Sequence, residues 1–126
     1  MNPTSIVYHS ASKTLELGYA SGEPMTLPAE LLRVYSPSAE VRGHSESERV
    51  VQTGKKHVGI ESLEAIGNYA IRIVFDDGHD TGIYSWAYLK DLGDNQARYW
   101  AQYETELRAM NGSRLPAIPV GQWTPQ

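Results

Sequence analysis

The chain has 126 residues, a formal net charge of −4 and no cysteine. This length suits one domain, and the lack of thiols excludes disulfides, thiolate metal sites and cysteine nucleophiles supplied by this chain. The acidic balance argues against broad binding of nucleic acid, whose affinity comes mainly from neutralised phosphates, although residues 54–59 with Arg33 and Arg42 leave a local basic patch open.

The sequence predicts neither a membrane-spanning segment nor a signal peptide. No uncharged apolar stretch approaches the about 20 residues of a membrane span. The opening sequence MNPTSIVYHSASK lacks the basic and apolar regions of a signal peptide. We therefore expect a cytoplasmic protein with no membrane partner.

The N-terminal third is predicted to form a hairpin followed by a short helix. Apolar and polar residues alternate around the turn sequence SASK, with Ile6 and Tyr8 before it and Leu15 and Leu17 after it. This alternation is typical of paired, half-buried strands. In the sequence MTLPAELLRVYSP, Pro28 suits the first position of a helix, and the last proline marks its end or a turn.

The middle of the chain is polar. Residues 43–57 contain five charged side chains and two histidines, which predicts an exposed loop or a long hairpin. Residues 48–52 and 57–66 can each form a strand. His44 and the two glutamates that follow it can chelate an ion on an extended strand, but a solvated loop is the favoured interpretation.

The sequence NYAIRIVFDDGHDTGIYSW predicts a second hairpin around DDG. A two-residue loop would place Phe75 opposite a carboxylate. A three-residue loop with Gly78 in the left-handed conformation places Phe75 opposite His79 and Ile71 opposite Ile83. We prefer the second register because it aligns apolar side chains with apolar side chains.

This register determines what His79 can do. His79 then lies at the edge of the core face, and Asp80 points to the opposite face because neighbouring strand residues alternate. Asp76 and Asp77 are expected at the tip. A polar turn with a half-buried histidine is the favoured interpretation. A metal or ligand site at His79 needs partners from elsewhere, such as His44 or the tip carboxylates, and general acid–base catalysis is a third interpretation.

Two helices and a tail are predicted at the C-terminal end. A short helix over 87–93 is expected to end at Gly93, and a longer one over 94–112 can be capped by Asp94 or Asn95. The longer helix has an apolar stripe that docks it onto the sheet or forms a partner surface. The stripe consists of Tyr99, Trp100, Tyr103, Leu107 and Met110.

These elements predict an α+β fold, mainly β, in which a small antiparallel module carries hairpins, a short helix after the 69–86 hairpin and an amphipathic C-terminal helix. Residues 1–112 form the domain. Residues 113–126 contain three prolines without periodicity and are expected to form a flexible tail, in which Trp123 can dock on a surface.

Two segments, LPAELLRVYSPSAEVRGH and IGNYAIRIVFDDGHDTGIYSWAYLKDLG, resemble the gamma-butyrobetaine hydroxylase-like N-terminal domain over roughly residues 5–93. The resemblance implies a compact, mainly β module with short helices. In the hydroxylases this module precedes an oxygenase domain, in bacteria it often stands alone, and it also occurs fused to ATPases of the iron–sulfur carrier type.

The resemblance also implies a zinc module with a Cys-x-Cys-x-x-Cys cluster and a later histidine. Here Ser36, Ser38 and Val41 stand at the cysteine positions, and His79 matches the histidine. Structural zinc needs thiolates and imidazoles, so we expect neither the zinc site nor another cofactor. We predict instead that His79 hydrogen-bonds to the turn formed by the two serines.

The leading functional hypothesis is a non-catalytic accessory or interaction domain. Its partner is unknown, and the fusions suggest an iron–sulfur carrier ATPase or an oxygenase. The alternative is a metal- or small-ligand-binding protein that uses His79, and the third hypothesis is an enzyme with an unrecognised pocket. Nucleic acid is not an expected partner. The candidate partner contacts are Tyr84, Trp86, Tyr88 and Trp123.

Overall fold

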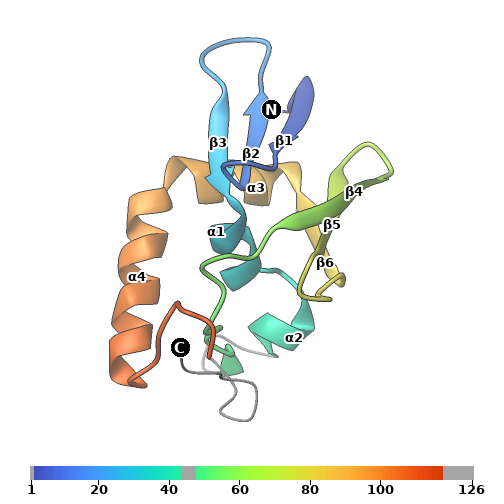
Figure 1. Ribbon diagram of the computed structural model, residues 1–126. Coiled ribbons are helices and arrows are strands. Elements are labelled where there is room, and N and C mark those ends of the chain that lie inside the picture. The colour runs from blue at the N-terminus through green and yellow to red at the C-terminus, as the bar shows by residue number, and fades with distance from the viewer. Residues whose placement is uncertain (1, 44–47, 118–126) are drawn as a thin grey trace.

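The computed structural model describes residues 2–43 and 48–117, which form two three-stranded antiparallel sheets and four helices (Figure 1). The predicted α+β class is confirmed. The elements are β1 (Ser5–His9), β2 (Thr14–Gly18), β3 (Met25–Pro28), α1 (Ala29–Val34), α2 (Ala39–Arg42), β4 (Ile60–Ile66), β5 (Ala70–Phe75), β6 (Gly82–Ser85), α3 (Trp86–Asp94) and α4 (Gln96–Ala109).

The first sheet has the order β1-β2-β3 and contains the predicted N-terminal hairpin. Ile6 pairs with Leu17 across it, and both Leu15 and Leu17 are fully buried. The third strand, which the sequence did not predict, runs directly into α1. Pro28 has an extended backbone conformation and precedes the helix, so the helix begins one residue later than expected.

The second sheet has the order β4-β5-β6, and its central strand buries the three residues predicted to face the core, Ile71, Ile73 and Phe75. The three-residue reversal is confirmed at the tip of the β5–β6 hairpin. There the Phe75 N–H donates to the His79 carbonyl over 2.9 Å, and Gly78 has a φ of 93°.

The predicted register is wrong beyond this tip. Ile73 pairs with Gly82 and Ile71 pairs with Tyr84, so the returning strand contains one extra residue before Gly82. Tyr84 therefore points inward and is fully buried, whereas Ile83 is 47% exposed. The physical reason is a hydrogen bond of 2.5 Å from the Tyr84 hydroxyl to the Leu32 carbonyl, which an Ile83 side chain cannot make.

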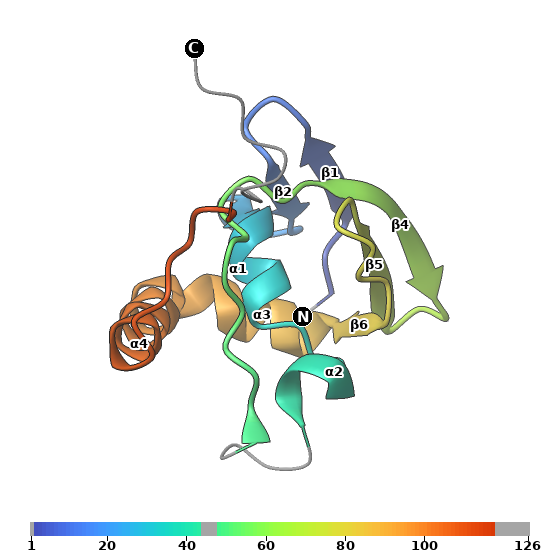
Figure 2. The ribbon, with the colours of Figure 1, turned by 60° about the horizontal axis from the view of Figure 1, so that its bottom comes forward.

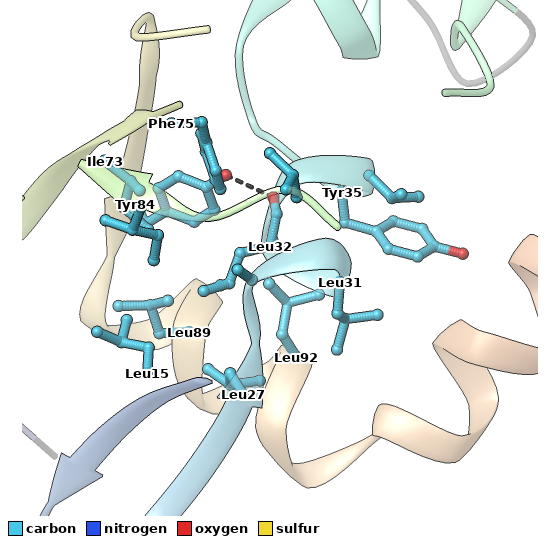
Figure 3. Packing of buried hydrophobic residues seen from close by; sticks show 14 of the residues in the cluster. Leu15, Leu27, Leu31, Leu32, Tyr35, Ile73, Phe75, Tyr84, Leu89 and Leu92 are labelled. Atoms are coloured by element: carbon cyan, nitrogen blue, oxygen red, sulfur yellow. Dashed lines mark hydrogen bonds between the residues drawn. The ribbon is translucent and has the colours of Figure 1, made fainter. Parts of the chain in front are cut away.

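The core surrounds α1, all six residues of which are buried. Figure 2 shows this helix between α4 on one side and the second sheet on the other. In Figure 3, Leu31 and Leu32 of α1 lie among side chains from both sheets and from α3. Buried leucines on a six-residue helix thus join two small sheets that could not each form a core alone.

The helix α3 does not end at Gly93 as predicted. It continues to Asp94, and Gly93 does not have the positive φ of a left-handed cap. A Cβ atom there would lie 1.7 Å from Sδ of Met25, so the glycine allows β3 to pack closely against α3. Asn95 follows, and its side chain binds the Asp91 carbonyl over 3.0 Å at the end of α3 instead of capping α4.

The apolar stripe of α4 packs against the end of α1 and residues 49–53, where a sheet was expected. The Tyr103 hydroxyl donates to the Gln52 carbonyl over 2.6 Å, and the Tyr35 hydroxyl donates to the Tyr99 carbonyl over 2.7 Å. Residues 49–53 follow an irregular path, so the predicted strand there is wrong. Met110 is 51% exposed and lies outside the packed stripe.

Contacts of the domain extend to Arg114, two residues past the expected boundary. The Gly54 N–H donates to the Ser113 carbonyl over 2.9 Å, and Arg114 forms two hydrogen bonds with Glu30 of α1. Trp123, His44 and Glu46 lie outside the described residues. Among the residues described, no helix is long and apolar enough to cross a membrane.

Candidate functional site

His79 is buried at the edge of the core, and the centre of its ring lies 6.0 Å from the centre of the Phe75 ring. Its Nε2 atom lies 2.8 Å from the Ser36 hydroxyl oxygen, so the predicted hydrogen bond to the serine turn is confirmed. A second bond of 2.6 Å joins the hydroxyls of Ser38 and Thr81. The two bonds hold the connection between α1 and α2 against the β5–β6 hairpin.

The surroundings of His79 determine its protonation. Burial, together with the charge of Arg33, lowers the pKa of His79 below its ordinary value, although Glu40 acts in the opposite direction. The Glu40 carboxylate lies 3.2 Å from Nδ1 and can only accept a hydrogen bond. In neutral His79, therefore, Nδ1 carries the proton and Nε2 accepts the hydrogen of Ser36.

A hydroxyl, an imidazole and a carboxylate in this order resemble a nucleophile with its general base. The accessibility of the hydroxyl argues against that chemistry, since Ser36 is only 1% exposed and its oxygen already accepts the Ser38 N–H. A Cβ atom at Gly82 would lie 2.6 Å from the same oxygen, so β6 closes over it. The arrangement can orient side chains and fasten a loop, but a substrate carbonyl has no access to it.

The same residues do not fit a structural zinc ion. Val41 has no donor atom and is buried, and serine hydroxyls are poor zinc ligands. Within residues 2–43 and 48–117, no three His, Cys, Asp or Glu side chains form a group that could hold a metal ion. The lone pair of Nε2 that a metal would use is directed at Ser36.

Asp76 and Asp77 do more than occupy a solvated tip. Asp76 accepts the Gly59 N–H over 3.0 Å, while Asp77 binds Arg33 over 2.9 Å and Lys55 over 2.6 Å. Burial alone would raise the pKa of Asp77, but hydrogen bonds from Lys55, the His79 N–H and Arg33 outweigh it and lower the pKa to about 2. Asp76 and Asp77 therefore connect the hairpin to the segment before β4, and Asp77 also connects it to α1.

The candidate partner contacts occupy different environments. Tyr84 is fully buried, so it cannot contact a partner, and this expectation is corrected. Trp86 and Tyr88 lie half-buried on the first turn of α3. The Trp86 indole donates to the Asn68 carbonyl over 2.8 Å, and the backbone N–H of Trp86 donates to the Tyr69 carbonyl. Tyr69 is 60% exposed.

A pocket of about 600 Å³ opens beside the serine turn. The anticipated basic patch does not form as a unit, because Arg33 and Lys55 share Asp77 while Arg42 lines this pocket. We call it the arginine–tyrosine pocket; it is lined by Arg42, Arg49, Arg98, Tyr35, Tyr88 and Tyr99, among others. The sequence does not predict this pocket, because its arginines and tyrosines follow no local spacing. Only Arg98 and Tyr99 are neighbours in the sequence.

The sequence model of the gamma-butyrobetaine hydroxylase-like N-terminal family matches residues 6–90, and the chain belongs to this family. Two proteins with NMR solution structures are similar over nearly the whole chain. One is 46% identical, with 99% of this chain and 93% of that chain covered and a TM-score of 0.78. The other is 45% identical, with coverage of 98% and 97% and a TM-score of 0.80.

A crystal structure of a DUF971-family protein of unknown function from Acidithiobacillus ferrooxidans ATCC 23270 is also similar. It is 36% identical, covers 73% of this chain and 92% of that chain, and has a TM-score of 0.62. No functionally curated protein matches the chain. The chain therefore shares its fold with these three proteins, one of which is described as having unknown function.

Proposed function

We propose that this protein is a non-catalytic accessory module that works in the cytoplasm by binding a protein partner. The supporting observation is the family match over residues 6–90, because the description of this family names an N-terminal domain of hydroxylase-like proteins. The two similar NMR structures are of chains about as long as this one. The sequence resemblance connects this module both to chains with a catalytic domain and to short chains, and we expect such a module to serve an enzyme supplied separately.

The proposed partner is an iron–sulfur carrier ATPase or an oxygenase, the two kinds of protein to which the sequence resemblance connects this module. Trp86 and Tyr88 are the proposed contacts on α3, and exposed Tyr69 beside Trp86 extends that surface. Aromatic side chains of this kind are enriched at the centres of protein interfaces. Trp123 stays a proposed contact from the tail.

Direct binding tests this proposal. The purified chain is titrated separately with the iron–sulfur carrier ATPase and with the oxygenases of its source organism, and the affinity is measured by interferometry. We expect one of them to bind, with Trp86→Ala weakening the complex and Met110→Ala, an exposed apolar control on α4, leaving it unchanged. A chain ending at residue 117 measures the contribution of Trp123. Absence of binding to every candidate would contradict the proposal.

A further inference from the structure

Three arginines in the arginine–tyrosine pocket are each stacked on a tyrosine ring. The guanidinium carbon of Arg42 lies 5.0 Å from the ring centre of Tyr88. The corresponding distances are 4.1 Å for Arg49 over Tyr35 and 4.5 Å for Arg98 over Tyr99. These residues come from the end of α1, from α2, α3 and α4, and from the segment after α2, so only the folded chain brings them together.

Two of the three arginines have no carboxylate partner among the residues that the structure describes. Arg49 is paired with Glu106 over 3.2 Å, and its side chain is only 12% exposed. Arg42 and Arg98, by contrast, form no ion pair with any residue in the part of the chain that the structure describes. Each also hydrogen-bonds to the side chain of its tyrosine, Arg42 to Tyr88 and Arg98 to Tyr99. Because a guanidinium carries five N–H donors, further donors of each arginine are left to bind an anion.

The tyrosines that support these arginines are fixed in place. The Tyr35 hydroxyl donates to the Tyr99 carbonyl over 2.7 Å, and the Tyr88 hydroxyl donates to the Tyr35 carbonyl over 2.5 Å. Their rings are therefore held in position before any ligand arrives. A binding site that is ordered in advance loses less conformational entropy when it binds.

The charge around the pocket is opposite to that of the whole chain. Among the residues that the structure describes, its lining contains three arginines and one carboxylate, that of Glu106, within a protein of net charge −4. A general attraction for anions is therefore not expected from this molecule. An anion that binds must be bound by this local group of arginines.

We propose that the arginine–tyrosine pocket binds a small anion with two or more carboxylate or phosphate groups. The planar donor pairs of arginine match the oxygens of both groups. The volume of about 600 Å³ lies within the range of about 300–1,000 Å³ that is usual for small-molecule sites. Arg42 and Arg98 each bind one anionic group, Arg49 supplies a fixed positive charge, and the tyrosine rings form the walls. This site does not depend on the partner proposed above.

Titration of the ¹⁵N-labelled full chain tests the proposal. Citrate is the carboxylate probe and inorganic pyrophosphate is the phosphate probe, both added at constant ionic strength and pH so that screening stays constant. We expect saturable shifts of the amide signals of residues that line the pocket, for at least one probe. Binding of only one of the two identifies the anionic group that the site prefers.

Exposed arginines provide matched variants. Arg42→Gln and Arg98→Gln should each lower the affinity for the probe by about tenfold or more, because each removes a charge-assisted hydrogen bond. Arg108→Gln removes the same charge from α4 outside the pocket and should leave the affinity unchanged. Thermal unfolding of each variant confirms that the fold is retained. Failure of both probes to saturate, or an equal loss in Arg108→Gln, would overturn the proposal.

Discussion

The imidazole of His79 stays neutral at neutral pH, because burial and Arg33 lower its pKa from the ordinary value of 6.5. As the pH falls, the unfolded chain takes up a proton on this residue before the folded chain does. The stability that neutral His79 contributes is therefore fully present above about pH 7 and is lost progressively below pH 6.5.

We expect His79→Gln to remove this part of the pH dependence. The free energy of unfolding, measured in urea between about pH 8 and pH 5, should fall less steeply in the variant than in the original protein. His57→Gln, which replaces a histidine exposed to solvent, is the control substitution. An unchanged slope in His79→Gln would mean that burial does not perturb this residue.

Asp77 has a similar effect at lower pH. Its pKa of about 2 in the folded chain lies below the ordinary 3.8, so its contribution is present above about pH 4 and is lost as the pH falls towards 2. We expect Asp77→Asn to cost about 1–2 kcal/mol near neutral pH, allowing for solvent screening. The difference from the original protein should shrink in acid. Asp80→Asn, with a side chain 53% exposed, should cost little stability near neutral pH.

β6 and the connection between α1 and α2 lie very close together. A Cβ atom at Gly82 would come within 2.6 Å of the Ser36 oxygen, which hydrogen bonds hold in place. We expect Gly82→Ala to lower the free energy of unfolding by about 1–3 kcal/mol through overpacking.

A double-mutant cycle isolates this contact. Ser36→Ala removes the oxygen that the new methyl group would meet, so Gly82→Ala should cost less in that background than in the original protein. Urea denaturation of the four proteins gives the coupling energy. Strictly additive losses would show that the strain arises elsewhere, for example against the nearby ring of Tyr84.

The sequence could predict those elements whose local pattern has one solution. The inward face of β5 and the helix α4 are of this kind, since alternation and helical spacing indicate them directly. The register beyond the hairpin tip is different, because either Ile83 or Tyr84 can fill an inward position. The choice depends on the Leu32 carbonyl, 52 residues away from Tyr84 in sequence, and no local pattern contains that information.

The candidate site was predictable to a similar extent. The bond between His79 and Ser36 could be expected because the family resemblance placed both residues at one position of the fold. The helical turn α2 was missed although Ser38 caps it by accepting the Glu40 N–H. The arginine–tyrosine pocket joins residues 42, 49 and 98, and their proximity results only from tertiary packing.

The segment after α4 contacts the folded domain. Arg114 binds the Glu30 carboxylate with two hydrogen bonds of 2.6 and 2.7 Å, and Glu30 is only 6% exposed. A chain ending at residue 112 leaves that carboxylate buried without its partner. We expect it to be less stable than a chain ending at residue 117 by about 1–3 kcal/mol, since Arg114 itself is partly exposed.

Thermal and urea unfolding of the two truncated chains measure this difference. Arg114→Gln in the longer chain should reproduce most of the loss, while Arg108→Gln should not. Equal stability of both truncated chains would place the end of the folded unit at residue 112.

The helix α1 is too short to persist by itself, because about 12–15 residues are needed for even marginal helicity in water. Its order comes entirely from the elements that enclose it, and its two charged side chains reach Arg114 in one direction and Asp77 in the other. We therefore expect its hydrogen-bonded amide hydrogens to exchange with solvent deuterium mainly when the protein opens as a whole. We expect them to exchange more slowly than those of α4, which is longer but has one side facing water, and hydrogen-exchange mass spectrometry can follow both helices together.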